Sequence, residues 1–201
     1  MFLYGKLFGA PYYRKNERCW GVIKMMELTK WIPYLAWVMV VLIGIGLATG
    51  KKRQSGELIT IVTLGVYLVV VGYLTLTPTS YAFGEVPTTN PVWVGPVPTN
   101  PFPFSGLSLD FYLNVVMMIP MGVYAALVTN WRNSRIFLAS VLIGLGIEMI
   151  QFMIDWLFGL ARWVDINDVL TNMVGFLIGY GVLTILQETP FKRVVDWFTV
   201  K

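Results

Sequence analysis

Carboxylate and amide side chains gather between residues 148 and 175 of a chain that is otherwise rich in apolar residues. Glu148, Gln151 and Asp155 are spaced at i, i+3 and i+7, so on a helix they share one face. A second stripe with helical spacing consists of Asp165, Asp168, Asn172, Gly175 and Gly179. If a short turn joins the two helices, the stripes should face each other. Ionisable groups inside a membrane are costly, so they are candidates for function.

Each of these side chains also has a purely structural interpretation. A carboxylate within a span, such as Glu148, can donate or accept a proton, or it can form a hydrogen bond between helices, for example to Asn172 or Asn114. An acid in the first turn of a helix stabilises the helix dipole, and Asp165 or Asp168 alone would suffice for that. The planar guanidinium of Arg162 can bind a phosphate or carboxylate, or form a salt bridge to Asp155 or Asp165.

The composition indicates a membrane protein. Of the 201 residues, 56% are hydrophobic and 13% are charged, whereas about a quarter of the residues of a soluble domain are charged. One cysteine and no histidine exclude a disulfide framework within one chain and a metal site built from His or Cys. Any metal here would need oxygen ligands, as Mg or Ca does; we expect no resident metal and no other cofactor. The net charge of +4 comes from short basic clusters beside apolar runs, which indicates membrane lipids as partners and not nucleic acid.

Long uncharged runs predict an all-α, polytopic membrane helical bundle with five transmembrane helices. The expected spans are about 31–49, 58–76, 110–128, 136–154 and 169–186. The second span ends at Thr77-Pro78, because proline cannot continue a helix. Residues 77–109 form the one long loop, in which repeated Pro, Thr and Asn make a stable helix implausible.

The segments on either side of the predicted transmembrane domain, residues 31–187, are more polar. Residues 1–30 lack the continuous apolar core of a signal peptide. They form an interfacial segment, or they precede a translation start at Met25 or Met26. Residues 188–201 predict a basic cytoplasmic tail at the membrane surface, with Lys192, Arg193 and Lys201 among aromatic residues.

The distribution of basic residues predicts the orientation. Lys and Arg occur in the turn at 51–53, in the turn at 132–135 and in the tail, whereas the opposite side has none in the long loop and Arg162 alone in the last turn. The basic residues before Lys30 disagree with this pattern unless translation starts at Met25 or Met26. The positive-inside rule therefore places the N-terminus and the long loop outside and the C-terminus in the cytoplasm. This orientation brings the polar ends of three spans to one outer level. The predicted ligand-binding residues are Asp110, Asn114, Glu148, Gln151, Arg162, Asp165, Asp168 and Asn172.

An ordered set of short motifs runs from the second span to the fifth. It comprises Leu76-Thr77-Pro78, Asp110-x3-Asn114, Pro120-x-Gly122, Glu148-x2-Gln151, Arg162-x2-Asp165-x2-Asp168-x3-Asn172-x2-Gly175 and Gly179. In this order, over about residues 58–186, the chain resembles the VanZ-like family of bacterial membrane proteins. That family is named after a protein associated with low-level resistance to the glycopeptide teicoplanin. The resemblance implies a multi-pass protein of the bacterial cytoplasmic membrane with a role in glycopeptide resistance or cell-envelope homeostasis.

Two functions fit these residues. The favoured one is a non-enzymatic protein whose polar outer-leaflet pocket binds an amphiphile: a lipid headgroup, a lipid-linked envelope precursor or a lipoglycopeptide such as teicoplanin. The alternative is an intramembrane enzyme that acts on a lipid or lipid-linked substrate, with Glu148 or Asp168 as the candidate catalytic acid or base. The absence of histidine and of a nucleophile motif weighs against the enzyme. An ion or proton carrier is disfavoured, because no acidic path continues toward the cytoplasmic side.

Overall fold

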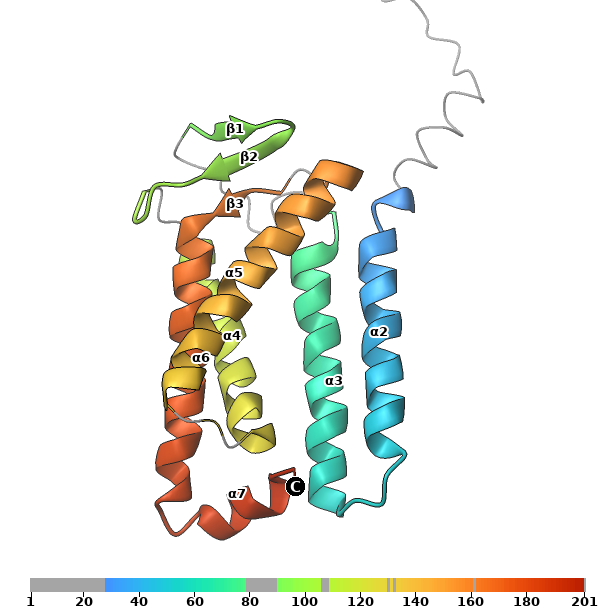
Figure 1. The fold of residues 1–201 in the computed structure, drawn as a ribbon, viewed down its shortest axis with the longest axis vertical. Helices are drawn as coiled ribbons and strands as arrows, with labels where there is room; N and C mark the ends of the chain where they lie inside the picture. The colour runs from blue at the N-terminus through green and yellow to red at the C-terminus, as the bar shows by residue number, and fades with distance from the viewer. Residues whose placement is uncertain are drawn as a thin grey trace, which may run out of the picture.

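The computed structural model describes residues 28–78, 90–105, 109–129, 131, 133–160 and 162–200. It contains five helices that are long and apolar enough to cross a membrane, and they stand together as a bundle (Figure 1). They are α2 (Ile32–Thr49), α3 (Ser55–Leu76), α4 (Leu109–Val128), α5 (Asn133–Phe158) and α6 (Ile166–Gln187). The predicted five-span membrane bundle is therefore confirmed. Residues 1–27, with the alternative start at Met25 or Met26, lie outside the described residues.

Helices α3, α5 and α6 each extend at least three residues beyond the predicted spans, and the ends of α5 and α6 at their common turn have a local cause. Helix α6 begins at Ile166, because the side chain of Asp165 accepts a hydrogen bond from the Asn167 amide at 2.8 Å and caps the helix. Helix α5 continues to Phe158 and ends where Gly159 adopts a φ of 61°, a left-handed conformation that glycine tolerates. The turn between α5 and α6 is correspondingly tight.

Helices α4 and α6 form the closest pair in the bundle. Gly175 lies against the backbone of Val115, Gly179 against that of Ile119, and Gly122 against that of Phe176. Without side chains at these points, the two backbones can touch. Lipid tails are as apolar as the helices, so close van der Waals packing of this kind drives association in a membrane.

The expectation that the whole second stripe faces α5 is wrong for its two glycines, which face α4. The reason is the course of α5, which runs obliquely across the bundle, from beside α6 toward the end of α3 (Figure 1). Helix α5 meets α6 at Gly144, whose Cα lies close to the carbonyl of Val169 and the side chain of Asn172. Only the part of the stripe nearest the α5–α6 turn, Asp165, Asp168 and Asn172, faces α5.

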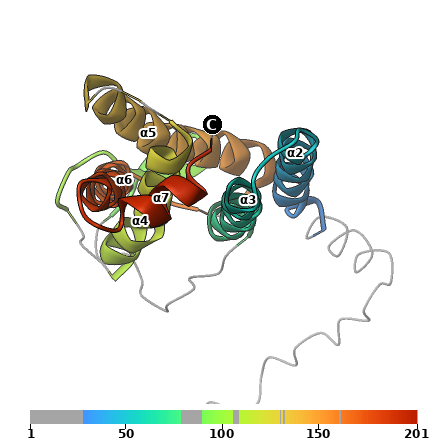
Figure 2. The same ribbon diagram turned by 90° about the horizontal axis from the view of Figure 1, so that it is seen from below.

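Helix α2 lies at the edge of the bundle and packs on α3 (Figure 2). The ring of Trp37 fills the space over Gly72, and its indole N–H donates to the carbonyl of Leu68 at 2.7 Å. Helix α3 in turn contacts α4 through Tyr67, whose hydroxyl donates to the carbonyl of Met117 at 2.8 Å. Helix α3 therefore connects α2 with the rest of the protein.

A small sheet covers one end of the bundle (Figure 1). Strands β1 (Val92–Val94) and β2 (Val97–Asn100) form an antiparallel hairpin, and β2 pairs in parallel with β3 (Val164–Asp165). The hairpin turn contains Gly95 at a φ of 60°, and this residue lies on the ring of Trp156 at the end of α5. The sequence did not predict these strands, because they are very short and β2 contains a proline.

The predicted tail contains a helix, α7 (Lys192–Phe198), which lies across the opposite end of the bundle (Figure 2). Val195 is buried with Ala126, Leu127 and Leu183. The hydroxyl of Thr60 donates to the carbonyl of Phe198 at 2.7 Å, and the Val200 amide donates to the carbonyl of Leu127 at 2.9 Å. The tail therefore joins α3, α4 and α6 in addition to any contact with lipid.

We expect Val195→Ala to lower the free energy of unfolding by about 1.5–2 kcal/mol, because it removes two methylene equivalents from a packed cluster. Val194 is the matched control, since it is 56% exposed on the same helix, against 6% for Val195. Val194→Ala should change the unfolding free energy by less than about 0.5 kcal/mol. Reversible unfolding in mixed micelles, followed by circular dichroism, measures both. Equal effects would show that α7 is not packed on the bundle.

Candidate functional site

The polar face of α5 points into the protein at the end that carries the sheet. Glu148 and Asp155 are each 3% exposed, and Gln151 is 8% exposed. Groups this buried require hydrogen bonds or compensating charge. Their partners come from three different parts of the chain: the end of α3, the loop after α5 and the start of α6.

Glu148 connects α5 with the start of α6. Its Oε2 accepts a hydrogen bond from the backbone amide of Asp165 at 3.1 Å. The charges of Asp168, Asp165 and Arg162 all act on it. Glu148 is therefore a member of a group of three carboxylates and one guanidinium, and one of its oxygens is used to hold the turn between α5 and α6.

The end of α3 supplies backbone carbonyls to this group. The Gln151 amide donates to the carbonyl of Thr75 at 3.2 Å. Arg162 donates to the carbonyl of Thr77 through Nε at 3.0 Å and through Nη2 at 2.8 Å. The last carbonyls of a helix have no partner within it, and the following Pro78 has no amide hydrogen to offer. Gln151 and Arg162 thus complete the end of α3.

The positive charge of Arg162 is retained although the side chain is largely enclosed. Burial lowers the pKa of Arg162 to about 10, while the carboxylates of Glu148 and Asp155 act in the opposite direction. A guanidinium with a pKa near 10 is still protonated at neutral pH. The salt bridge to Asp155 or Asp165, one of the two interpretations of Arg162, does not form among the described residues. Arg162 instead donates two hydrogen bonds to Thr77 and acts on Glu148 and Asp155 as a nearby charge.

Asp165 joins the sheet to α6. Its carboxylate accepts hydrogen bonds from the side-chain amide of Asn100, at 3.1 Å to each oxygen, and from the backbone amide of Asn167. Burial raises the pKa of Asp165 above its usual range, and the hydrogen bonds from Asn167 and Asn100 only partly oppose this. The capping role that the sequence suggested for this acid is what the structure shows.

Asn167 holds the segment after β2 against α6. Its Oδ1 accepts the amide of Phe104 at 2.6 Å, and its Nδ2 donates to the carbonyl of Ser105 at 3.0 Å. Phe104 has a φ of 60°, which is unusual for a residue other than glycine. Asn100 and Asn167 were missed by the sequence analysis. The signal that was available is their type, since Asn commonly bonds to nearby backbone in loops and at helix starts.

Two buried oxygen atoms of the group have no hydrogen-bond donor among the described residues: Oδ1 of Asp155 and Oδ1 of Asn172. Asn172 is 2% exposed and lies at the contact between α5 and α6, beside Gly144. An unpaired buried acceptor costs about 1–3 kcal/mol. No hydrogen bond among the described residues compensates for the burial of these two oxygens, so they are candidates for contact with a ligand.

The remaining predicted residues are less closely tied to this group. Asp168 is half-buried in the first turn of α6, and its charge acts on Glu148. Asn114 is half-buried on α4, and the described residues give it no hydrogen bond to the group. The side chain of Asp110 lies outside the described residues. Within the described part of the chain, no three His, Cys, Asp or Glu side chains are arranged to hold a metal ion.

We call the residues brought together here the polar cluster. It consists of Glu148, Gln151, Asp155, Arg162, Asp165 and Asp168, with the carbonyls of Thr75 and Thr77, and Asn172 lies at its inner edge, beside Gly144 of α5.

Comparison with known proteins gives a family. No curated protein and no solved structure matches the chain. A family model described as VanZ/LLP1 matches residues 64–187, which extend from the first half of α3 to the end of α6 and contain the whole polar cluster. Because the matched region is more than half of the chain, this membrane protein belongs to the VanZ/LLP1 family.

Proposed function

We propose that the polar cluster binds the polar head of an amphiphile at the outer face of the cytoplasmic membrane. The observation that carries the proposal is the pair of buried oxygens, Oδ1 of Asp155 and Oδ1 of Asn172, that have no donor among the described residues. Asn172 lies beside Gly144, eleven residues or roughly 16 Å along α5 from Asp155, so a ligand whose N–H or O–H groups extend over that length would supply both missing donors. Arg162, which stays charged, is available to an anionic group of the same ligand through the nitrogen that does not contact Thr77.

The surroundings of the cluster support an amphiphile over a wholly polar ligand. Arg162, Asp165 and Asp168 are half-buried, so they form the side of the cluster nearest to solvent. The hairpin and the segment that follows it expose apolar side chains, with Trp93 at 63% and Phe102 at 61%. A headgroup at the cluster would leave its acyl part beside lipid-facing helices. The candidate ligands are therefore a lipid headgroup, a lipid-linked envelope precursor and a lipoglycopeptide such as teicoplanin.

The orientation belongs to the same proposal. The turn at Lys51–Arg53, Arg135 and the basic residues of α7 lie at the end of the bundle opposite the cluster. The positive-inside rule assigns that end to the cytoplasm. The polar cluster and the turn between α5 and α6 are then on the outer side of the membrane. A role in glycopeptide resistance or envelope homeostasis would follow from binding at that outer face.

The test is a binding titration with purified protein in nanodiscs. Teicoplanin, a lipid-linked peptidoglycan precursor and a zwitterionic phospholipid are the three probes. We expect one of the first two to bind. Asp155→Asn with Asn172→Leu should weaken that binding by about 100-fold or more, since each lost charge-assisted or buried bond is worth about 1.5–3 kcal/mol and two are lost. Asp196→Asn, an exposed acid on α7, is the control and should bind as the wild type does. Unchanged affinity in the double variant would overturn the proposal.

A second candidate is an intramembrane enzyme that acts on the same class of molecule. The observation that favours it is the electrostatic coupling of Glu148 with Asp168 and Arg162 inside the bundle. Glu148 or Asp168 would then transfer a proton while Arg162 holds the substrate. Glu148→Gln separates the candidates, because an enzyme loses turnover of the lipid-linked precursor and keeps binding. If cells that carry Glu148→Gln together with Arg162→Ala keep a normal envelope and normal resistance, both candidates fail and a scaffold remains.

A further inference from the structure

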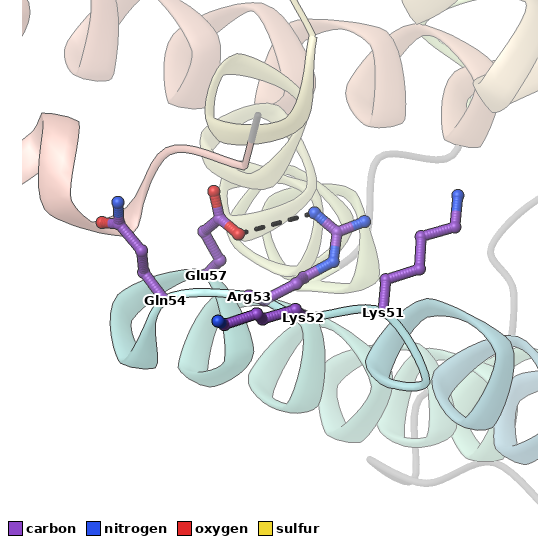
Figure 3. Close-up of a pocket in the computed structure, with 5 residues that line it drawn as sticks. All are labelled: Lys51, Lys52, Arg53, Gln54 and Glu57. Atoms are coloured by element: carbon purple, nitrogen blue, oxygen red, sulfur yellow. Dashed lines mark ion pairs between the residues drawn. The ribbon is translucent and has the colours of Figure 1, made fainter.

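A cleft of about 480 Å³ opens at the turn between α2 and α3, at the end of the bundle opposite the polar cluster (Figure 3). Its lining comes from one short segment of the chain: Lys51, Lys52, Arg53, Gln54 and Glu57. The turn joins the ends of two membrane-spanning helices, Thr49 of α2 and Ser55 of α3. The cleft therefore lies at the level where lipid headgroups meet the protein.

The centre of the cleft is already neutralised. Nη1 of Arg53 lies 3.6 Å from Oε2 of Glu57, and the two side chains are only 15% and 10% exposed. Nε of Arg53 also donates to the carbonyl of Ala48 at 3.0 Å. Arg53 is thus fixed in place by α2 and α3, and it cancels the one negative charge in the lining.

The charge that remains belongs to Lys51 and Lys52. Both side chains are exposed, and their ammonium groups lie on the two sides of the Arg53–Glu57 pair (Figure 3). Neither forms an ion pair with a residue that the structure describes. The cleft therefore carries two free positive charges around a neutral centre.

The start of α3 adds to this positive potential. Gln54, which lines the cleft, is the N-cap residue of the helix, and its side chain makes no capping hydrogen bond. The positive end of the dipole of this 22-residue helix therefore lies at the cleft, where Glu57, the acid in the first turn, offsets part of it. A helix start of this kind favours an anion, phosphate above all.

We propose that this cleft binds the phosphate group of an anionic phospholipid in the leaflet at that end of the bundle. The lipid is favoured over free phosphate because apolar side chains continue directly below the cleft. Leu47 and Ile43 of α2 are 74% and 57% exposed and would contact the acyl chains of the same lipid. The site is independent of the function proposed for the polar cluster.

The test is native mass spectrometry of the whole protein in a neutral detergent, with an equal mixture of phosphatidylglycerol and phosphatidylcholine as the probe. The wild type should retain phosphatidylglycerol preferentially. A basic residue near the membrane surface contributes about 1 kcal/mol to the binding of an anionic lipid, which is about fivefold in affinity. The double variant Lys51→Gln with Lys52→Gln should therefore reduce the preference by about fivefold if one lysine contacts the phosphate, and by up to about 25-fold if both do. Lys51→Arg with Lys52→Arg keeps the charge and should keep the preference.

The charge-matched control is Lys192→Gln with Arg193→Gln, two exposed cations of α7 that do not line the cleft. It should retain the preference for phosphatidylglycerol. An equal loss in the control and in the lysine variant would show a general effect of charge and overturn the proposal, as would no loss in either. Inorganic phosphate added at the concentration of the lipid should not displace phosphatidylglycerol. If it does, the site takes a free anion and the assignment to a lipid is wrong.

Discussion

Replacing Arg162 by alanine should lower the free energy of unfolding by about 3–5 kcal/mol, the largest effect expected of any single substitution in the polar cluster. The guanidinium donates two hydrogen bonds to the carbonyl of Thr77, and its charge acts on Glu148 and Asp155, which are almost completely buried. Without it, both carboxylates lose their compensating charge, and the end of α3 loses its partner. Reversible unfolding in mixed micelles gives the change directly.

Two further substitutions separate the contributions of charge and hydrogen bonding. Arg162→Lys keeps the positive charge without the two-pronged contact to Thr77, so it should cost less than alanine. Glu148→Gln should cost less in the Arg162→Ala background than in the wild type, because the uncompensated charge is then removed. Arg193→Ala, an exposed position on α7, is the reference for loss of an arginine alone. If Arg162→Ala costs no more than this reference, the cluster is not held together by its guanidinium.

Substituting the glycines between α4 and α6 should produce the second large effect. A methyl group at Gly179 would overlap the backbone of Ile119, and one at Gly175 would overlap the carbonyl of Val115 and meet Cβ of Met118 at 3.0 Å. Backbone atoms cannot move aside as a side chain can, so the helices must separate. We expect Gly175→Ala and Gly179→Ala each to cost about 1–3 kcal/mol, and the double variant to cost more than either.

The chain provides its own controls for this prediction. Gly181 lies two residues from Gly179 on the same helix, and Gly146 lies on α5, and neither has an atom within 4 Å of the position that a Cβ would occupy. Alanine there should be neutral or stabilise the helix by up to about 1 kcal/mol. Thermal unfolding of the four single variants in one detergent would test the contrast. Similar values for Gly179→Ala and Gly181→Ala would contradict the close packing of α4 on α6.

The sequence predicted the spans well because a membrane imposes a strong requirement on length and polarity. It also placed Glu148, Gln151 and Asp155 on one face, and the structure buries all three. What it did not provide is the identity of their partners. Gln151 and Arg162 bind the carbonyls of Thr75 and Thr77. Every residue has a backbone carbonyl, so residue types do not reveal which carbonyl will accept a hydrogen bond.

The arrangement of neighbouring helices was the other part that the sequence left open. Gly175 and Gly179 indicated that some helix approaches α6 closely, but their spacing does not tell which one. Because α5 runs obliquely across the bundle, α4 is the helix that packs against these two glycines. The sheet was missed for a different reason, since the pairing of Asn100 with Asp165 joins residues 65 positions apart and strands of a few residues have no periodicity to detect.

The pairing of β2 with β3 constrains how the chain is threaded through the bilayer. Hydrogen-bonded strands occupy the same aqueous compartment, so Thr99 and its partner Val164 are on one side of the membrane. Between them the chain must cross an even number of times, which α4 and α5 accomplish with one crossing each. This parity does not depend on any count of lysine and arginine. A reagent that cannot permeate the bilayer therefore reaches cysteines introduced at both positions or at neither.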